Sequence, residues 1–285
     1  MSAQPVIKTL LFEASERLAP TSDSPRADAE ILLAHVLGKG RTYLFAWPEK
    51  QLEPEQESLF LDLIARRQTG EPIAYLTGTR EFWSREFLIT PDVLIPRPET
   101  ELLVELALDR IPQDQACVVA DLGAGSGAIA VTVALERPKA RVWASDISGA
   151  ALAVAKANAE RQGARNVEFV LSDWLDGLPP LPYDLIVSNP PYIAEHDPHL
   201  AEGDLRFEPT GALASGPDGL DAIRRIAADA RGRLKPGGAL LLEHGYDQAE
   251  AVQALLCGLG YRDVASHRDL LGHGRVTLGL LPPSP

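Results

Sequence analysis

Residues 188–192 read Ser-Asn-Pro-Pro-Tyr and follow the apolar run "YDLIV", which has the composition of a buried strand. The side chain of Asn189 carries an amide oxygen that accepts hydrogen bonds. Because proline fixes φ and has no N–H, the carbonyl group of Pro190 is held in place as a second acceptor. Two fixed acceptors match the two N–H bonds of a planar NH₂ group. The pattern predicts that Asn189, Pro190, Pro191 and Tyr192 bind a planar amide or amine, with the tyrosine ring stacked on it. A strand-ending turn without a ligand is the simpler alternative.

A glycine-rich segment, "DLGAGSGAIA" at 121–130, lies between a predicted strand and a predicted helix. Glycines let the backbone turn sharply and approach a ligand closely, and the start of a helix supplies free N–H groups. The pattern also fits the loose dinucleotide fingerprint, so a nicotinamide-dependent dehydrogenase and a turn without a ligand stay open. The predicted cofactor-binding residues of this loop are all small: Gly123, Ala124, Gly125, Ser126 and Gly127.

Two further strand ends carry residues suited to a nucleotide. Asp146 ends the strand after the glycine loop, where an acid accepts hydrogen bonds from ribose hydroxyls. Because Ser148 and a helix follow, Asp146 has a helix N-cap as its structural alternative. Trp174 ends the next strand in "SDW", where the indole can pack on an adenine ring.

The elements that must position these residues fall into two regions. Residues 1–78 show helical spacing of apolar residues at 5–18, 25–38 and 53–70, which predicts a small helical domain. Residues 79–96 are rich in aromatic and β-branched residues and predict a hairpin connector. From residue 97 to 285, apolar strands alternate with amphipathic helices, which predicts an α/β fold with a parallel sheet covered on both faces. The last two strands are joined without a helix and should add an antiparallel strand.

Composition narrows the class of protein. The 285 residues carry a net charge of −13, with 18 Lys and Arg against 29 Asp and Glu in residues 81–285. An acidic surface repels a phosphate backbone, which disfavours direct nucleic-acid binding and favours a protein partner. The chain lacks an apolar stretch of the roughly 18–20 residues that span a bilayer and the features of a signal peptide. Cys117 and Cys257 are interpreted as reduced core thiols, so we expect a cytoplasmic protein without membrane contact.

Five sequence motifs, taken in their order along the chain, resemble those of a known protein family. The chain resembles the bacterial release factor glutamine methyltransferases (the PrmC/HemK family), S-adenosylmethionine-dependent protein-(glutamine-N5) methyltransferases with a helical N-terminal domain. The motifs that carry the resemblance are "LIPRPETE" (94–101), "DLGAGSGAIA" (121–130), "SDW" (172–174), "SNPPYI" (188–193) and "RFEP" (206–209).

The resemblance implies a Rossmann-like class I methyltransferase sheet and a substrate, the glutamine of the Gly-Gly-Gln motif in class-I peptide chain release factors. It implies S-adenosylmethionine as cofactor, with its methionine part by the 123–127 loop, its ribose on Asp146 and its adenine near Trp174. Asn189 would serve substrate and cofactor, and Asn189 and Pro190 would be catalytic; no metal is expected.

Three questions stay open on the sequence. The segment that contains Arg97, Glu99 and Glu101 either caps a helix near Thr100, or one of these residues faces the amino-acid end of the cofactor or closes the pocket. A DNA adenine N6-methyltransferase would share the Asn189–Tyr192 tetrapeptide, although it needs a basic face to bind DNA and flip a base. A protein that binds the cofactor without catalysis is also conceivable. We expect the chain to act as a monomer.

Overall fold

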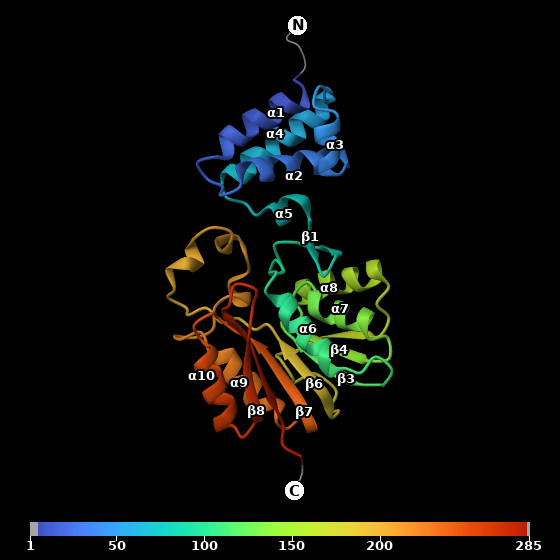
Figure 1. Cartoon of the computed structure of the whole chain (residues 1–285), viewed down its shortest axis with the longest axis vertical. Coiled ribbons are helices and arrows are strands. Elements are labelled where there is room, and N and C mark those ends of the chain that lie inside the picture. Colours follow the sequence, from blue (N-terminus) through green and yellow to red (C-terminus); the bar gives the residue numbers. More distant parts are fainter. Residues whose placement is uncertain (1–4, 284–285) are drawn as a thin grey trace. The chain divides into compact units, whose positions relative to one another are not determined.

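The computed structural model describes residues 5–283 and divides into two compact units at Thr79 and Arg80 (Figure 1). We call the part up to Thr79 the helical unit and the part from Arg80 the sheet unit. Within the described range, we find no helix that combines the length and the apolarity needed to cross a bilayer.

Within residues 5–79 the helical unit contains five helices, and two of them begin at recognisable sequence signals. Pro25 and Pro54 stand at the first helical positions of the second and fourth helices. Gly38 ends the second helix in the left-handed region at φ 60°. The two short helices between and after the long ones escape the periodicity argument because they span only one or two turns. The five are α1 (Ile7–Leu18), α2 (Pro25–Leu37), α3 (Arg41–Ala46), α4 (Pro54–Gln68) and α5 (Ile73–Thr77).

The core of the helical unit joins apolar side chains of α1, α2 and α4, including Leu11, Leu33 and Phe60. Asp28 of α2 is buried beside this core and forms an ion pair. The carboxylate of Asp28 lies 2.8 Å from the guanidinium of Arg67, which also donates to the carbonyl groups of Gly70 and Glu71. Because an unpaired buried charge is strongly unfavourable, this pair fixes the end of α4 against α2.

The sheet unit begins with a hairpin and continues with strands and helices in alternation. Among the described residues, a seven-stranded sheet has the strand order β5-β4-β3-β6-β7-β9-β8, in which β9 runs opposite to the other strands. The strands are β1 (Thr79–Phe82), β2 (Arg85–Leu88), β3 (Val118–Leu122), β4 (Arg141–Asp146), β5 (Val167–Leu171), β6 (Tyr183–Ser188), β7 (Leu234–Glu243), β8 (Arg262–Arg268) and β9 (Gly274–Leu280). The helices are α6 (Thr100–Arg110), α7 (Ala128–Glu136), α8 (Gly149–Gln162), α9 (Asp221–Ala230) and α10 (Ala249–Gly258), with 3₁₀ turns at Pro198–Ala201, Leu205–Phe207 and Thr210–Ala212.

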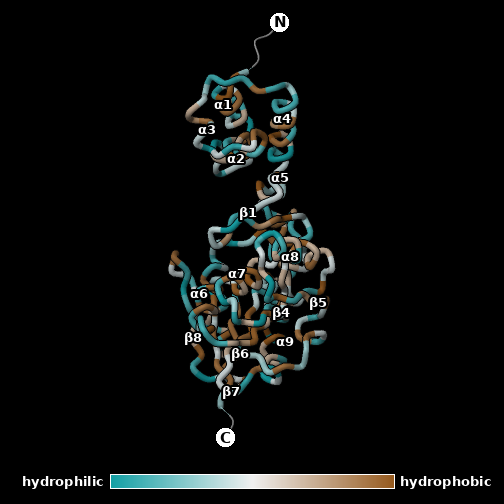
Figure 2. The backbone as a smooth tube through the Cα atoms, turned by 90° about the vertical axis from the view of Figure 1, so that its right-hand side faces the viewer, coloured by the Kyte–Doolittle hydropathy of each residue, from teal (hydrophilic) through white to brown (hydrophobic). Residues whose placement is uncertain are grey.

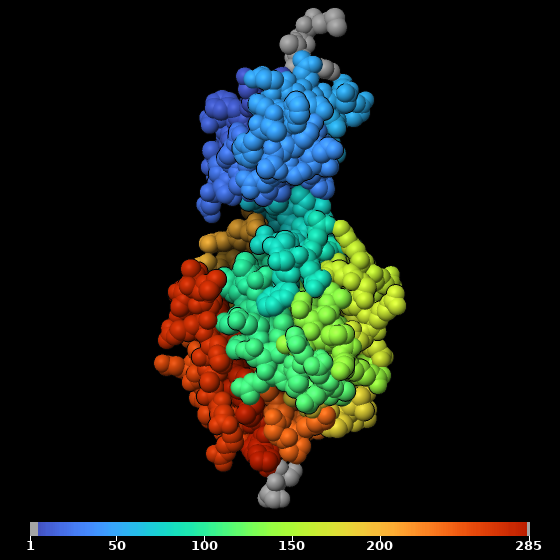
Figure 3. Space-filling view, turned by 45° about the vertical axis from the view of Figure 1, so that its right-hand side comes forward, coloured from blue at the N-terminus to red at the C-terminus, as the bar shows by residue number. Residues whose placement is uncertain are grey.

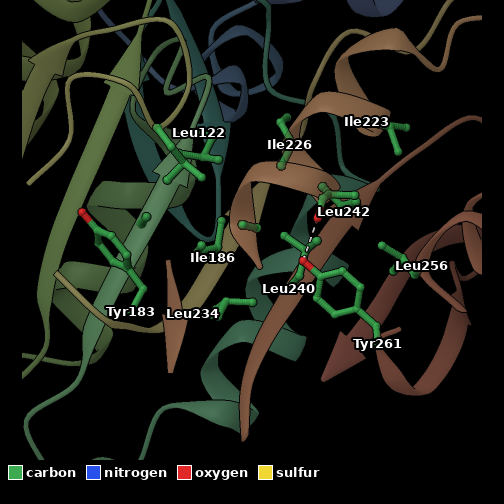
Figure 4. Packing of buried hydrophobic residues seen from close by; sticks show 14 of the residues in the cluster. Leu122, Tyr183, Ile186, Ile223, Ile226, Leu234, Leu240, Leu242, Leu256 and Tyr261 are labelled. Atoms are coloured by element: carbon green, nitrogen blue, oxygen red, sulfur yellow. Dashed lines mark hydrogen bonds between the residues drawn. The ribbon is translucent and has the colours of Figure 1, made fainter. Parts of the chain in front are cut away.

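Helices cover both faces of this sheet, with α6, α7 and α8 on one and α9 and α10 on the other (Figure 1). Figure 4 shows Leu240 and Leu242 of β7 packed with Ile226 of α9 and Leu256 of α10, in a fully buried cluster. Strands buried on both faces read as continuous apolar runs, and β6 is accordingly coloured largely as hydrophobic in Figure 2. The predicted fold class, including the antiparallel strand near the end of the chain, is confirmed.

The strand order creates a switch point between β3 and β6. The chain leaves β3 toward β4, whereas it leaves β6 toward β7, so the loops after these neighbouring strands diverge. Open α/β sheets bind ligands in the crevice at such a point. Pairing of Leu122 with Ser188 brings the glycine loop and the Asn189 tetrapeptide to the same crevice. The hydroxyl of Ser188 also donates to the carbonyl of Leu122 at 2.6 Å, which locks the two strand ends together.

The hairpin and the cysteines differ in part from the sequence-based expectation. The strands end at Leu88, so most of the segment up to Glu99 is irregular chain that covers the side of the sheet unit (Figure 3). The turn uses Trp83 and Ser84, both at positive φ, and Phe82 packs edge-to-face on Phe87. Cys257 is exposed on α10, so its interpretation as a core thiol is wrong: it falls on the outer side of an amphipathic helix.

One glycine supports the chain directly behind the tetrapeptide. Gly219 has φ +77°, and a Cβ added there would lie 2.2 Å from the carbonyl oxygen of Tyr192. Gly237 has a similar φ of +80°, but its added Cβ would meet no atom of the described residues within 4 Å.

We therefore expect Gly219→Ala to lower the stability of the protein more than Gly237→Ala. Both variants carry the left-handed strain of about 1–2 kcal/mol, but only the first also displaces the Tyr192 backbone. Denaturant unfolding followed by tryptophan fluorescence measures the difference. Equal destabilisation by the two substitutions would contradict the close packing of Gly219.

Candidate active site

The glycine loop follows β3 and is held by its neighbours. The N–H groups of Gly123 and Ala124 both donate to the carbonyl of Ser145, at 2.9 and 2.8 Å. Gly127 has φ +81°, and an added Cβ would stand 3.1–3.2 Å from Ala155 of α8. Only glycine allows both the positive φ at this position and the close contact with Ala155. The loop can therefore pack directly against α8.

A buried asparagine that the sequence did not single out also holds the loop. Asn158 of α8 is fully buried, and its amide nitrogen donates to the carbonyl groups of Ser126 (2.9 Å) and Leu88 (3.0 Å). Its amide oxygen accepts from the N–H of Leu88 at 2.6 Å. The asparagine therefore fastens the hairpin and the glycine loop to one helix. A polar residue at a buried position of an amphipathic helix was the only available signal.

Asp146 lies at the end of β4 and binds the loop beside it. One carboxylate oxygen accepts from the N–H of Gly125 and the other from the N–H of Ser148, both at 2.9 Å. The side chain of Ser148, not Asp146, caps α8 by accepting from Ala151. A carboxylate oxygen accepts more than one hydrogen bond. Asp146 therefore keeps acceptor capacity toward the cavity that it borders.

Trp174 closes the same side of the crevice. Its backbone adopts φ 50°, and its indole lies over Gly123, where an added Cβ would come within 3.3 Å of the ring. The preceding acid, Asp173, forms a 2.9 Å ion pair with Arg225 of α9. The ring thus has a fixed position above the glycine loop.

The tetrapeptide after β6 has its first side chain oriented by a hydrogen bond. The amide nitrogen of Asn189 donates to the hydroxyl oxygen of Thr100, the first residue of α6, at 3.1 Å. The amide oxygen is therefore left as the group that can accept from a ligand. The carbonyl of Tyr192 accepts from the amide nitrogen of Gln248 at 2.9 Å. Burial raises the pKa of the Tyr192 hydroxyl well above its usual value.

Two adjoining cavities border these residues. The larger has a volume of about 460 Å³, within the range of small-molecule sites. The smaller has about 50 Å³ and is lined by Asn189, Tyr192, Arg97, Leu94, Leu205 and their neighbours. Asn189 borders both. The predicted site residues along the larger cavity are Gly123, Ala124, Gly125, Ser126, Asp146, Trp174, Asn189 and Pro191, whereas Gly127, Pro190 and Tyr192 lie outside its lining.

The larger cavity has walls that suit a nucleoside. Apolar groups line it, among them Ile129, Ile147 and Leu94, and these can pack on a flat base. Asp146 supplies the acceptor that ribose hydroxyls need, and the glycine loop admits a ligand close to the backbone. The residues present therefore fit S-adenosylmethionine.

The sequence left the role of Arg97 open. In the structure, Arg97 supports the cavity wall that contains Pro209. Its guanidinium pairs with the carboxylate of Glu208, whose side chain is fully buried. Glu208 also accepts from the N–H of Ile95 at 3.1 Å. Burial raises the pKa of Glu208, while Arg97 opposes that shift. The pair joins "LIPRPETE" to "RFEP" and holds Pro209 at the cavity.

Glu101, an acid of the "LIPRPETE" motif, has a different partner from Arg97. The carboxylate of Glu101 accepts from the N–H of Trp83 at 2.8 Å and so holds the hairpin turn. The side chain of Glu99 makes no cap bond at the start of α6. Within residues 5–283, therefore, the side chains of Arg97, Glu99 and Glu101 do not provide the helix cap that the sequence left open.

A second buried acid lies beneath the glycine loop. Asp121 ends the apolar run of β3 with no exposed surface, and one of its oxygens accepts from the N–H of Ala130 at 3.0 Å. Its other oxygen, Oδ1, has no hydrogen-bond partner within residues 5–283. Burial, together with the charge of Asp146, raises the pKa of Asp121 to about 8. The sequence shows this residue only as the first letter of the loop motif.

Comparison with known proteins identifies relatives for nearly the whole chain. Residues 9–78 match the family model described as PrmC N-terminal domain, and residues 99–204 match the methyltransferase small domain. The chain is 57% identical to the release factor glutamine methyltransferase of Bordetella pertussis over 258 residues, covering 90% of this chain and 95% of the relative. It is 49% identical to the release factor glutamine methyltransferase of Escherichia coli, covering 90% and 93%.

Two solved structures share the fold. The chain superposes on a methyltransferase from Pyrococcus furiosus with a TM-score of 0.54 and 17% identity, covering 77% of this chain and 98% of the other. It superposes on the 16S rRNA N2 G1207 methyltransferase of T. thermophilus with a TM-score of 0.51 and 21% identity, covering 71% and 49%. At these identities the likeness concerns the fold alone.

Removal of the Asp146 carboxylate tests the larger cavity. We expect Asp146→Ala to weaken S-adenosylmethionine binding by about 10- to 100-fold, the loss that follows from one charged hydrogen bond. Isothermal titration calorimetry measures the affinity. Asp176→Ala is the matched control, because Asp176 is an exposed acid paired with Arg225 that does not border the cavity. An unchanged affinity in Asp146→Ala, with the control also unchanged, would exclude Asp146 from the binding site.

Proposed function

The chain belongs to the release factor glutamine methyltransferase family, and we propose that it methylates the side-chain nitrogen (N5) of the glutamine in the Gly-Gly-Gln motif of class-I peptide chain release factors. The methyl donor of the family is S-adenosylmethionine, which supplies an activated methyl group on a sulfonium when bound. The observation that carries the proposal is the orientation of Asn189. Its amide nitrogen is engaged by Thr100 and its oxygen stays available beside the glycine loop.

Because the methyl group of the donor is already activated, the enzyme must mainly align the glutamine nitrogen with it. The lone pair of an amide nitrogen is delocalised into the carbonyl group, so the nitrogen is a weak nucleophile. In the proposal, the oxygen of Asn189 and the carbonyl of Pro190 accept the two N–H bonds of the glutamine amide and turn its nitrogen toward the larger cavity. Such positioning lowers a barrier by several kcal/mol. The same acceptors stabilise positive charge that develops on the nitrogen, a contribution of about 3–4 kcal/mol by analogy with single oxyanion-hole donors.

The proposal assigns the two cavities to two ligands. The cofactor takes the larger cavity, with Gly123–Gly127 near its methionine part, Asp146 on its ribose and Trp174 near its adenine. The glutamine side chain takes the smaller cavity, where the ring of Tyr192 stacks on the amide and Pro191 keeps the turn rigid. Arg97 and Glu208 hold the wall that adjoins both. In the proposal, apolar residues such as Leu94 and Ile193 along the smaller cavity limit the access of water to the glutamine nitrogen.

The partner and the compartment belong to the same proposal. The helical unit, residues 1–78 in the sequence-based division, recognises the release factor, and the segment 79–96 connects it to the catalytic part. Phe45 and Trp47 are exposed on the helical unit and offer apolar contact area for a protein. The enzyme acts as a cytoplasmic monomer on a protein substrate, without direct nucleic-acid contact.

Mass spectrometry tests the activity itself. After incubation with S-adenosylmethionine, a class-I release factor should gain the mass of one added methylene on the peptide that contains its Gly-Gly-Gln motif. A DNA duplex incubated in parallel tests the adenine N6 alternative. Methyl transfer to DNA but not to the release factor would overturn the proposal.

Truncation of Asn189 tests the mechanism. We expect Asn189→Ala to lower turnover by about 10²–10³-fold, because one of the two acceptors that orient the nitrogen is lost. Affinity for S-adenosylmethionine should stay within a few-fold of wild type. Single-turnover kinetics together with calorimetry separate the two effects. Turnover near the wild-type rate would show that Asn189 does not orient the substrate.

A further inference from the structure

A glutamine directly before α10 binds the last residue of the tetrapeptide and has no part in the mechanism above. The amide nitrogen of Gln248 donates to the carbonyl groups of Tyr192 at 2.9 Å and of Asp218 at 3.3 Å. Its amide oxygen accepts from the N–H of Gly245 at 2.8 Å. This one side chain therefore joins the tetrapeptide, the segment before α9 and the chain just after β7.

The three partners fix which way the Gln248 amide points. The two ends of such an amide have nearly the same shape, so the surrounding hydrogen bonds must select the orientation. A backbone N–H only donates, whereas a backbone carbonyl only accepts. In the reversed orientation the oxygen would face two carbonyl groups and the NH₂ group would face the N–H of Gly245, so all three hydrogen bonds would be lost.

Gly245, which binds the Gln248 oxygen, is itself held by a buried histidine. His244 has no exposed surface, and its Nδ1 atom lies 2.9 Å from the carbonyl oxygen of Gly245. Because a carbonyl only accepts, Nδ1 carries the hydrogen. The Nε2 atom lies 2.8 Å from the hydroxyl oxygen of Thr277 in the neighbouring strand β9. The interior of the sheet unit therefore sets the position from which Gln248 reaches the tetrapeptide.

The hydrogen bond from Gln248 holds one edge of the peptide group between Tyr192 and Ile193. The opposite edge is bound as well, because the N–H of Ile193 donates to the carbonyl of Leu213 at 2.9 Å. A trans peptide group is planar, so hydrogen bonds on its two edges fix its orientation. Tyr192, Ile193 and Leu213 all line the smaller cavity. Without Gln248, this peptide group can turn about its bond to the Tyr192 Cα atom and shift that wall of the cavity.

The backbone at Gly219 packs against the hydrogen bond between Gln248 and Tyr192. Gly219 is buried, and a Cβ added there would lie 2.2 Å from the Tyr192 oxygen and 2.8 Å from the Gln248 Nε2 atom. A hydrogen bond that is shielded from water is electrostatically stronger than an exposed one. The packing therefore favours a single arrangement of this contact.

We propose that Gln248 is a positioning residue that holds the Tyr192 peptide group, and with it the tyrosine ring, where the ring stacks on the substrate amide. This inference rests on the proposed function and adds to it a residue outside the tetrapeptide. Gln248 does not belong to the described residues that line the two cavities. Its loss therefore disturbs the alignment of the bound glutamine and leaves the binding of the cofactor unchanged.

Kinetics on a release factor test this role with two substitutions of similar shape. Gln248→Met cannot donate to a carbonyl, and we expect it to lower kcat by about 10- to 100-fold, because small displacements of a positioned group are costly. KM and the affinity for S-adenosylmethionine should stay within a few-fold of wild type. Gln248→Glu keeps an acceptor for the N–H of Gly245 but turns an oxygen toward the two carbonyl groups, so it should lose at least as much kcat.

The matched control is a glutamine that binds a backbone carbonyl away from the tetrapeptide. Gln162 of α8 is half-buried, and its amide nitrogen donates to the carbonyl of Glu86 at 3.3 Å. Gln162→Met should keep the wild-type kcat. A wild-type kcat in Gln248→Glu would show that only the bond to Gly245 matters and would refute the proposed contact with Tyr192.

A measurement without substrate separates this inference from the proposed function. In NMR spectra, the ¹³C signal of the Tyr192 carbonyl and the ¹⁵N signal of the Ile193 amide report on the peptide group between them. Both signals should shift in Gln248→Met and Gln248→Glu and keep their wild-type positions in Gln162→Met. Absence of methyl transfer by the wild type would refute the proposed function alone. Unshifted signals in both Gln248 variants, or a loss of activity that lies in KM and not in kcat, would refute the role of Gln248.

Discussion

The adjacency of β3 and β6 is the constraint on which the site depends. These strands pair in parallel, yet the chain leaves them in opposite directions, so their loops open a crevice instead of filling it. The Ser188 hydroxyl bound to the Leu122 carbonyl closes the two strand ends at 2.6 Å. The positions of the groups that line the cavity, from the glycine loop to the Asn189 amide, are set by these two strand ends.

Buried acids around the crevice hold its parts in position. Glu208 joins the two segments of the outer wall through Arg97, and Asp121 caps the first turn of α7 from below. Each acid lies where water is excluded, so its hydrogen bonds are stronger and its loss of a partner is more unfavourable than on the surface. These acids therefore fix the shape of a site whose own lining consists largely of glycine, alanine and apolar side chains.

The sequence predicted which segments form helices or strands better than it predicted which side chains are buried or hydrogen-bonded. The long helices α1, α2 and α4 and the strand-helix alternation follow from periodicity, whereas α3 and α5 are too short to show it. Cys257 looked like a core residue because its neighbours in α10 are apolar, but it lies on the exposed side. Asp146 looked like a ribose acceptor or a helix cap, while in the structure it also ties down the glycine loop.

The sequence by itself determined the chemical groups of the site: a tetrapeptide with two fixed acceptors, a loop of small residues, and an acid and an indole at strand ends. These follow from local rules, because the φ of proline and the freedom of glycine do not depend on distant residues. Only the tertiary structure decided that Thr100, the first residue of α6, lies beside Asn189, which directly follows β6. Their meeting depends on strand order and register, which arise from packing of the whole sheet and leave no signal in any short stretch of sequence.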